Sequence, residues 1–182
     1  VTVLNPEGTG PLTGVVRVSA GFSHSCAVLT DTTARCWGTN SRGALGDGTT
    51  TSRTLPVVVS DETGSGPLTG IVQVELGEER SCAVLTNGQV RCWGPTQPRP
   101  VAVSNPGNTG PLTDVTAVAV GYDHTCARRR TGQVACWSGT GSGPELPSLV
   151  SDPTGTDHLS GVTSIAADSG RPVTVDLTVT PA

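Results

Sequence analysis

With 182 residues, a net charge of −4 and a sequence pI of about 5.2, the chain is mildly acidic, and all its fixed basic side chains are Arg. This balance lacks the basic face that general nucleic-acid binding requires, and the longest apolar runs are too short to cross a membrane. We therefore expect no nucleic-acid partner and no membrane span. The 24 Gly and 14 Pro residues, with aromatics at 3%, are typical of short strands joined by turns and unfavourable for helices.

Three runs rich in β-branched residues, at 15–20, 71–76 and 115–120, predict the first strands of three similar units. Two strands that each contain a cysteine follow in each unit. In the second unit their sequences are SCAVL and QVRCW. The runs 55–60 and 99–104 carry an early proline, as an outer edge strand tolerates, and they predict fourth strands. Four antiparallel strands per repeated unit form the blade of a β-propeller.

The pattern therefore predicts one all-β domain, residues 1–182, with three full four-stranded units and a partial one. The full units cover about 15–60, 71–104 and 115–151, and the partial unit combines 162–182 with 1–4. The partial unit is thus split between the two termini.

Each full unit places two cysteines ten residues apart, one on either side of a predicted hairpin. In the second unit, a three-residue loop Thr86-Asn87-Gly88 with Gly88 in the left-handed conformation makes Cys82 face Cys92. A two-residue turn would instead place the two thiols on opposite faces of the sheet. Direct cross-strand neighbours are close enough for a disulfide after modest adjustment. The expected bridges are Cys26–Cys36, Cys82–Cys92 and Cys126–Cys136.

Free buried thiols and a metal site are the alternatives to these bridges. Nine residues between the two thiols is not zinc-ligand spacing, and no His stands beside each pair. We expect no metal and no cofactor. Because disulfides persist in oxidising compartments, the cysteine pairs predict a secreted or cell-surface protein.

The units resemble the RCC1-type repeat, named after the regulator of chromosome condensation. The matching residues are Gly-x-x-His at 21–24 and 121–124, CAVLT at 26–30 and 82–86, Trp-Gly at 37–38 and 93–94, and the stretch 40–59. The resemblance implies a seven-bladed β-propeller whose loops bind protein partners, and the cysteine pair looks like the secreted bacterial version of the repeat. The founder's roles in nucleotide exchange on a small GTPase and on chromatin are not carried over, because disulfides and an acidic balance argue against them. A secreted β-lactamase inhibitor in the wider family implies that the scaffold can also block an extracellular enzyme.

The chain departs from the family pattern, because it has three complete hairpins and a last unit without Cys or Trp. Residues 1–4 align with the outer strand of a blade, and the segments VTSIAAD and PVTVDLTV near the other end look like first and second strands. Four arrangements stay open: a self-closed ring of about four blades, a ring of seven or eight blades from two chains, an open array joined by strand addition, and a fragment of a longer protein.

Self-association is the preferred interpretation of these ends. The segment with Val173, Val175, Leu177 and Val179 alternates apolar and polar residues. It contains no Lys, and it has a single Asp whose charge could protect an edge strand from pairing with another chain. Such an unprotected edge strand invites pairing with another chain.

Arg128, Arg129 and Arg130 replace the Val-Leu-Thr that the other two hairpins carry. Successive strand residues point to opposite faces, so Arg128 and Arg129 cannot both be buried. Because Arg128 stands where Val28 and Val84 stand, either that face is uncovered in the third unit or it meets an acidic partner. A solvated cluster is the plain interpretation, and a partner or subunit contact is the alternative.

No catalytic set is apparent in the sequence. His24 and His124 occupy equivalent positions two residues before a cysteine, which favours a structural hydrogen bond over a ligand role. In the Gly-rich connectors, Asx-turn capping is favoured over calcium binding for the Asn and Asp side chains. These side chains are Asn5, Asp61, Asn105 and Asp152, and the carboxylate of Glu7 lies in the first of these connectors.

The sequence as a whole predicts a non-enzymatic extracellular structural or protein-interaction scaffold that assembles with copies of itself through its terminal strands. The alternative is a secreted protein-binding module, such as an enzyme inhibitor, that acts through propeller loops. Self-association distinguishes them, because a structural subunit assembles without a partner whereas an inhibitor is a discrete particle.

Overall fold

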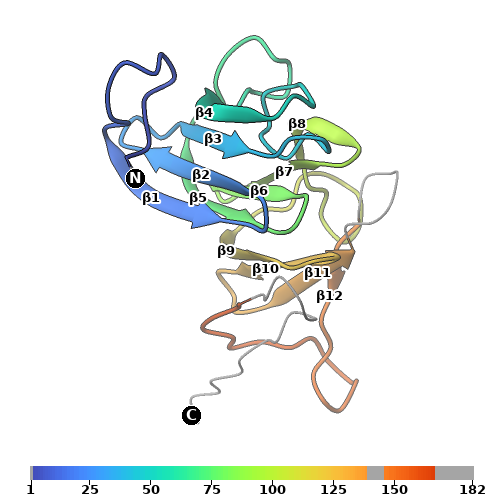
Figure 1. Ribbon diagram of the computed structural model, residues 1–182. Helices are drawn as coiled ribbons and strands as arrows, with labels where there is room; N and C mark the ends of the chain where they lie inside the picture. Colours follow the sequence, from blue (N-terminus) through green and yellow to red (C-terminus); the bar gives the residue numbers. More distant parts are fainter. Residues whose placement is uncertain (1, 139–145, 167–182) are drawn as a thin grey trace.

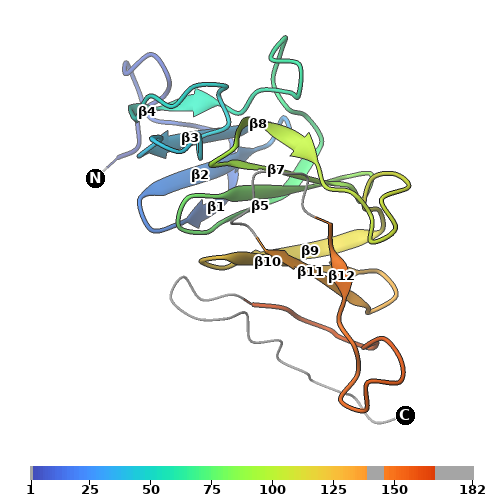
Figure 2. The same ribbon diagram turned by 90° about the vertical axis from the view of Figure 1, so that its right-hand side faces the viewer.

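The structure of the protein, a computed structural model, describes residues 2–138 and 146–166. These residues form twelve β-strands and no helix, arranged as three antiparallel four-stranded sheets. The sheets are stacked face against face in chain order, so that the second lies between the first and the third (Figures 1 and 2). This arrangement confirms the predicted all-β propeller blades, and we refer to the sheets as blades 1, 2 and 3.

Within every blade the strands lie side by side in chain order, each paired with the next. Blade 1 consists of β1 (Val15–Ala20), β2 (His24–Leu29), β3 (Ala34–Gly38) and β4 (Arg53–Val58). Blade 2 consists of β5 (Ile71–Leu76), β6 (Ser81–Leu85), β7 (Val90–Gly94) and β8 (Gln97–Ala102). Blade 3 consists of β9 (Val115–Val120), β10 (His124–Arg129), β11 (Val134–Ser138) and the short β12 (Ser148–Leu149).

The outer strands β4 and β8 begin and end two residues earlier than the sequence predicted. Pro56 and Pro100 therefore lie inside these strands, which is tolerated because an outer strand pairs on one side only. An irregularity in the ladder between Cys36 and Gly38 lets Arg53 pair with Gly38, which extends β4 at its start. The sequence pattern did not indicate this bulge.

The central hairpin of each blade has the predicted register. In blade 2, Cys82 faces Cys92, and the Leu85 N–H donates to the Gln89 carbonyl at 2.9 Å. Gly88 closes this loop with a φ of 75°, in the left-handed region as expected. Thr32 takes the same place in blade 1 with a φ of 62°, and its hydroxyl accepts a hydrogen bond from the Gly70 N–H at 3.0 Å. That bond to the next blade compensates for a conformation that β-branched residues rarely adopt.

All three predicted cysteine pairs lie at disulfide distance across their hairpins. The bonds are Cys26–Cys36, Cys82–Cys92 and Cys126–Cys136, each with a Cα–Cα distance of 4.1 Å. The cysteine side chains point towards the neighbouring blade, so the bridges also form part of the packing between blades.

The apolar core lies between blades and not inside one sheet. Each blade has a forward face, which packs on the following blade, and a backward face, which packs on the preceding one. In blade 1 the forward face presents Cys26, Val28 and Cys36, and these contact the backward face of blade 2 around Ile71 and Val74. The next interface repeats the arrangement, with Cys82, Val84, Val90 and Cys92 facing Val115, Val118, Val120 and Trp137.

Beyond blade 3 the chain begins the partial unit. Val162 and Ile165 pack against the forward face of blade 3 at Cys126 and Val134. At the other end, residues 2–4 form no strand of a blade, and Leu4 makes a single bridge with Pro11. Residue 1 and residues 167–182, which include Val173, Val175, Leu177 and Val179, lie outside the described residues.

Removing one disulfide bridge tests how much the bridges contribute to stability. Replacing Cys82 and Cys92 together by Ala is expected to lower the free energy of unfolding by about 2–3 kcal/mol, because the closed loop no longer restricts the unfolded chain. Equilibrium urea unfolding measures this. Wild-type protein reduced with a thiol keeps all sulfur atoms but loses all three bridges, and its stability should fall further than that of the double variant. An unchanged unfolding midpoint in both samples would contradict the prediction.

Candidate interaction surface

Blade 1 exposes a backward face that its equivalents in blades 2 and 3 bury. Val18 on β1 is 74% exposed, whereas Val74 and Val118, at the same place on β5 and β9, are 4% and 2% exposed. The three residues occupy one register position in their blades, opposite Ala27, Ala83 and Ala127. The difference therefore comes from packing, since blades 2 and 3 each have a preceding blade in the described chain and blade 1 has none.

Two further positions follow the same rule. Val15 is 40% exposed, whereas Ile71 and Val115 are 2% and 4% exposed. Trp37 is half-buried, whereas Trp93 and Trp137 are buried. We call Val15, Val18 and Trp37 the open face. Large exposed apolar patches mark interaction sites on proteins, and these three side chains make this face of blade 1 a candidate for one.

The first residues of the chain border the open face. The Leu12 N–H donates to the Val3 carbonyl at 2.9 Å, as the Leu68 N–H donates to Val59 in the next connector. Val3 therefore occupies the place of Val59, yet it is 38% exposed and Val59 is 0% exposed. Val59 lies against β3, where its N–H donates to the Ala34 carbonyl. No strand pairs with Val3 in this way among the described residues.

A buried polar chain links blade 1 to blade 2. The Ala44 carbonyl accepts hydrogen bonds from the Ser81 hydroxyl and the Trp93 indole N–H, both at 2.8 Å. His24 Nε2 lies 2.9 Å from the same Ser81 oxygen. Since the single hydroxyl proton of Ser81 goes to Ala44, we assign Nε2–H of His24 as the donor in this contact. His24 thus makes the structural hydrogen bond that its repeated position suggested.

Burial lowers the pKa of His24 from 6.5 to about 4. The ring is 3% exposed, and its Nδ1 has no hydrogen-bond partner among the described residues. Protonation would therefore create a buried charge and a buried N–H without an acceptor, which explains the direction of the shift. His124 is half-buried and lies 2.6 Å from Asp123, so the two equivalent histidines have different environments.

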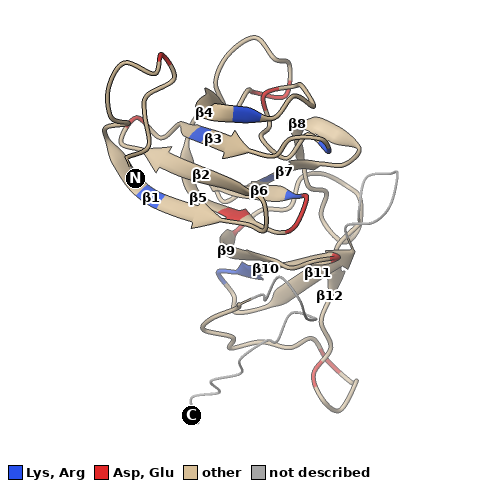
Figure 3. Cartoon of the chain, in the orientation of Figure 1, with Lys and Arg blue, Asp and Glu red and all other residues tan. Residues whose placement is uncertain are grey.

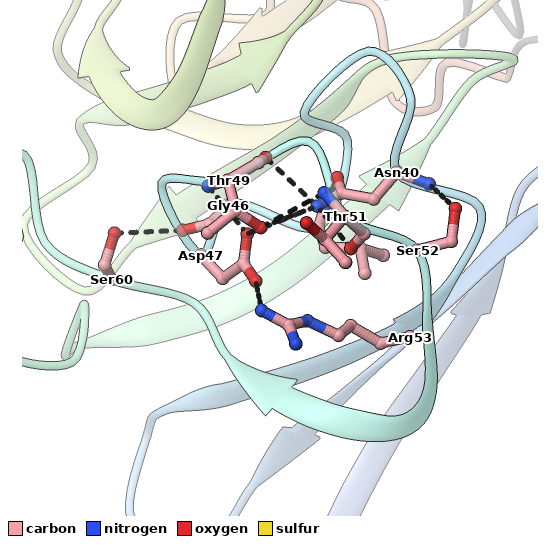
Figure 4. Close-up of polar contacts among 9 residues, drawn as sticks. Asn40, Gly46, Asp47, Thr49, Thr51, Ser52, Arg53 and Ser60 are labelled. Carbon is pink, nitrogen blue, oxygen red and sulfur yellow. Dashed lines mark hydrogen bonds and ion pairs between the residues drawn. The ribbon is translucent and has the colours of Figure 1, made fainter.

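The loop that carries Ala44 is organised by Asn40, which sequence reasoning did not single out. Asn40 is 1% exposed, and its side-chain oxygen accepts the Leu45 N–H at 2.9 Å. Its amide group donates to the carbonyls of Thr49 and Thr51 at 3.0 and 3.1 Å (Figure 4). A buried Asn that closes a long loop on itself is not visible in the spacing of the sequence.

Asp47 continues this network towards the outer strand. Its carboxylate accepts hydrogen bonds from the N–H and hydroxyl of Thr49 at 2.9 and 2.8 Å, and it pairs with Arg53 at 3.3 Å (Figure 4). Gly48 follows with a φ of 78° and donates to the Pro98 carbonyl of blade 2 at 3.0 Å. The turn at Asp47-Gly48 therefore also connects blade 1 to blade 2.

The arginine cluster is only partly solvated. Arg128 is half-buried and donates to the Val162 carbonyl at 3.5 Å, so the start of the partial unit covers the face that it occupies. The face of Arg128 is therefore not left uncovered, and a partner or subunit contact of the arginine cluster stays a prediction. Arg129 points to the other side and pairs with Asp114 at 3.8 Å, and Arg130 is exposed.

Charges of both signs are interspersed over the blades and loops (Figure 3). Acidic and amide side chains of the connectors cap their own turns, as at Asp61, whose carboxylate accepts the Ser65 N–H at 3.1 Å. The Thr63 hydroxyl, with further donors of that turn, holds the pKa of Asp61 below its usual range. These connector side chains therefore cap Asx turns in the structure.

The inner strands β1, β5 and β9 surround a hollow of about 510 Å³ together with residues 165–166. Gln73 crosses from blade 2 to blade 3 here, donating to the Val118 carbonyl at 3.2 Å. Within the described ranges no three metal-ligating side chains gather into a group, and no helix has the length and apolarity of a membrane span.

Comparison with known proteins identifies the repeat. Models of the regulator of chromosome condensation (RCC1) repeat match residues 15–44 and 115–143, and residues 36–84. Among solved structures, human WBSCR16 is similar with a TM-score of 0.66 and 18% identity over 85% of this chain and 42% of that one. The structure of Kap60 bound to yeast RCC1 (Prp20) is similar with a TM-score of 0.63 and 14% identity. The match covers 85% of this chain and 40% of that one.

A structure of Prp20p from Saccharomyces cerevisiae is similar with a TM-score of 0.60 and 16% identity, over 88% of this chain and 43% of that one. The chain thus spans about two-fifths of the length of the propellers that it matches. At these identities the likeness shows the fold, an RCC1-like β-propeller architecture.

The buried histidine predicts a specific pH dependence. Because the folded-state pKa of His24 is about 4 and the unfolded one is 6.5, the unfolded chain binds more protons in between. The contribution of neutral His24 to stability is therefore present above pH 6.5 and is lost as the pH falls towards 4. By pH 5 the loss from His24 amounts to about 2 kcal/mol.

Urea unfolding at neutral pH and at pH 5 tests this with His24→Gln, which removes the titrating group but keeps a donor. The exposed His158→Gln is the matched control and should lose as much stability as the wild type. Equal losses in all three proteins would contradict the assignment.

Asn40→Ala removes the centre of the loop network. We expect a loss of about 2–3 kcal/mol in the free energy of unfolding, because the buried Leu45 N–H loses its acceptor and two carbonyls lose their donor. The freed loop should also be cut by trypsin after Arg42 faster than in the wild type. Ser41→Ala, at an exposed neighbouring position, is the control and should behave as the wild type. Wild-type cleavage and stability in Asn40→Ala would refute this role.

Proposed function

This chain belongs to the family of regulator of chromosome condensation (RCC1) repeat proteins, and we propose that it is a non-enzymatic extracellular scaffold for protein–protein interaction. The observation that carries the proposal is the open face of blade 1. Val18 there is 74% exposed at a position that is buried in both other blades, and apolar surface of this kind stabilises a protein when it is covered by another one.

The extracellular part of the proposal rests on the cysteines. All six cysteines of the chain are paired in the three disulfide bridges. Such bridges persist in oxidising compartments, where thiols are not kept reduced. The non-enzymatic part rests on how the buried polar groups are used. His24 and Asn40 direct their hydrogen bonds to the loop and to blade 2, where they hold blades together.

Similar propellers bind proteins, which agrees with this proposal. One of the matched structures is yeast RCC1 (Prp20) bound by Kap60, and another study of Prp20p describes its binding to Gsp1p and histones. We do not transfer these partners, because the chain covers about two-fifths of those proteins at 14% and 16% identity. For this chain we propose copies of itself as the partner, joined through terminal strands.

A second candidate is a secreted binding module, such as an enzyme inhibitor, that acts through a loop. The network of Asn40 and Asp47 holds the loop of residues 39–52 in one conformation, and Thr50, Thr51 and Ser52 are exposed on it. A loop that is ordered before binding loses less conformational entropy in a complex. This candidate predicts a discrete monomer that binds an unrelated protein.

Cysteine state and location test the extracellular scaffold. The protein is extracted from its producing cells in the presence of an alkylating reagent and is weighed by mass spectrometry, before and after reduction. We expect no alkylated cysteine before reduction and six after it, and we expect protease added to intact cells or to their medium to reach the protein. Six alkylated cysteines in a protein shielded from that protease would overturn the proposal.

A further inference from the structure

The turns that follow the inner strands place three side chains in a row at one end of the blades. Each turn begins with a glycine, and the next residue is Phe22 in blade 1, Glu78 in blade 2 and Tyr122 in blade 3. The turns have one geometry, because each glycine N–H donates to the carbonyl of the third residue after it, at 2.9, 2.8 and 2.9 Å. We call Phe22, Glu78 and Tyr122 the rim.

Close backbone contact holds the three turns side by side. A Cβ at Gly21 would lie 2.4 Å from the Gly77 carbonyl oxygen, and a Cβ at Gly77 would lie 2.4 Å from that of Gly121. Glycine allows this approach, since any side chain would overlap with the backbone of the next turn. The Phe22 N–H also donates to the Gly77 carbonyl at 3.4 Å. The rim is therefore one surface built from three blades.

The rim exposes the single Phe and the single Tyr of the chain. Phe22 is 76% exposed and Tyr122 is 60% exposed, whereas Trp93 and Trp137 are buried. Tyr122 is exposed although blade 2 and the start of the partial unit pack on either side of its blade, so this position of the repeat faces solvent. An exposed aromatic ring forgoes the free energy that its burial would provide. Two such rings on one surface make that surface a candidate binding site.

A carboxylate without a partner lies between the two rings in the row. The Glu78 side chain makes no hydrogen bond or ion pair with any residue that the structure describes. The next residue, Glu79, pairs with Arg42 of the long loop at 3.6 Å. On blade 3, Asp123 is 59% exposed and its carboxylate lies 2.6 Å from His124. Of these three carboxylates, Glu78 is the one left for a partner.

Aromatic rings and a carboxylate together recognise a cation. The face of a ring attracts a positive charge, and a carboxylate pairs with it. A guanidinium group makes both contacts, because it is planar, stacks on rings and binds a carboxylate through two N–H groups. The basic side chains of the chain that lie nearby do not occupy Glu78, since Arg42 is paired with Glu79 and Arg80 is half-buried at the repeat position of His24.

We propose that the rim binds an arginine-bearing segment of another protein, whose guanidinium groups stack on Phe22 and Tyr122 and pair with Glu78. This names the chemistry of a partner for the proposed interaction scaffold and rests on that function. The site differs from the open face of blade 1, since it lies at the turns that follow β1, β5 and β9. The long loop of residues 39–52 borders the rim through Arg42 and extends the surface.

Fluorescence anisotropy of a labelled peptide measures the binding. The probe carries two arginines in a Gly-Ser background, and the full chain is titrated into it at low ionic strength. The same peptide with glutamine in place of arginine is the uncharged reference. We expect the arginine peptide to bind and the glutamine peptide not to bind. Added salt should weaken the binding, because it screens exposed charges.

Substitutions assign the binding to the rim. Phe22→Leu and Tyr122→Leu keep an apolar side chain but lose the ring, and each should weaken binding about two- to fivefold, as should Glu78→Gln. Tyr122→Phe keeps the ring and should bind as the wild type does. The triple variant, with Phe22→Leu, Glu78→Gln and Tyr122→Leu, should bind about tenfold more weakly or worse.

A matched control separates the site from the net charge of the chain. Glu7→Gln removes the same charge at an exposed carboxylate in the connector that precedes β1, and it should bind as the wild type does. Because Phe22 and Tyr122 are exposed, the substitutions should leave the blades folded, which an unchanged midpoint of urea unfolding checks.

The outcomes separate this inference from the proposed function. An arginine peptide that does not bind, a triple variant that binds as the wild type does, or an equal loss in Glu7→Gln overturns the inference. Light scattering adds a further test: a wild type that self-associates beside a triple variant that does not would assign the rim to a second copy and also overturn it. The cysteine state and location test the extracellular scaffold independently of all these results.

Discussion

The packing of one blade's disulfide face on the inner strand of the next blade is the contact on which the rest of the structure depends. A single four-stranded sheet of this chain has apolar residues on both sides and no core of its own. Stacking buries them, and each buried Val, Leu or Ile contributes about 1.5–3 kcal/mol relative to its exposed state. The blades are therefore stable as neighbours, as in other repeat architectures.

The polar groups of the structure serve this same contact. One carbonyl, that of Ala44, receives the Ser81 hydroxyl and the Trp93 indole of the next blade. It can do so because Asn40 holds its loop in place, and His24 completes the chain through Ser81. Blade 2 lacks a comparable long loop, since its β7 and β8 are joined by two residues, Pro95 and Thr96. The second interface is connected by a different polar contact, in which the Gln73 side chain bonds the Val118 backbone.

Much of the local structure could be predicted from the sequence. The inner strands, the hairpin register and the cysteine pairs follow from β-branched runs, a left-handed Gly88 and the two-residue period of strands. The outer strand limits could not, because a bulge beside Gly38 shifts the pairing without a marker in the sequence. The environment of Arg128 was also missed, because a backbone carbonyl of a distant segment, Val162, covers it.

The open face is the feature of the structure that the sequence could predict least. Val18, Val74 and Val118 are the same residue type in the same local pattern, so no property of the sequence around them distinguishes the exposed one from the buried two. Only the order of blades in space does that. A site of this kind is visible once the repeats are superposed and the exposure of equivalent residues is compared.

Amide hydrogen exchange at three equivalent positions, Val15, Ile71 and Val115, tests this account most directly. The account predicts slow exchange at Ile71 and Val115 at every protein concentration, because their N–H groups are bonded to the preceding hairpin. It predicts faster exchange at Val15, because no hairpin precedes this residue among the described residues. Protection at Val15 that equals that of Ile71 would contradict it.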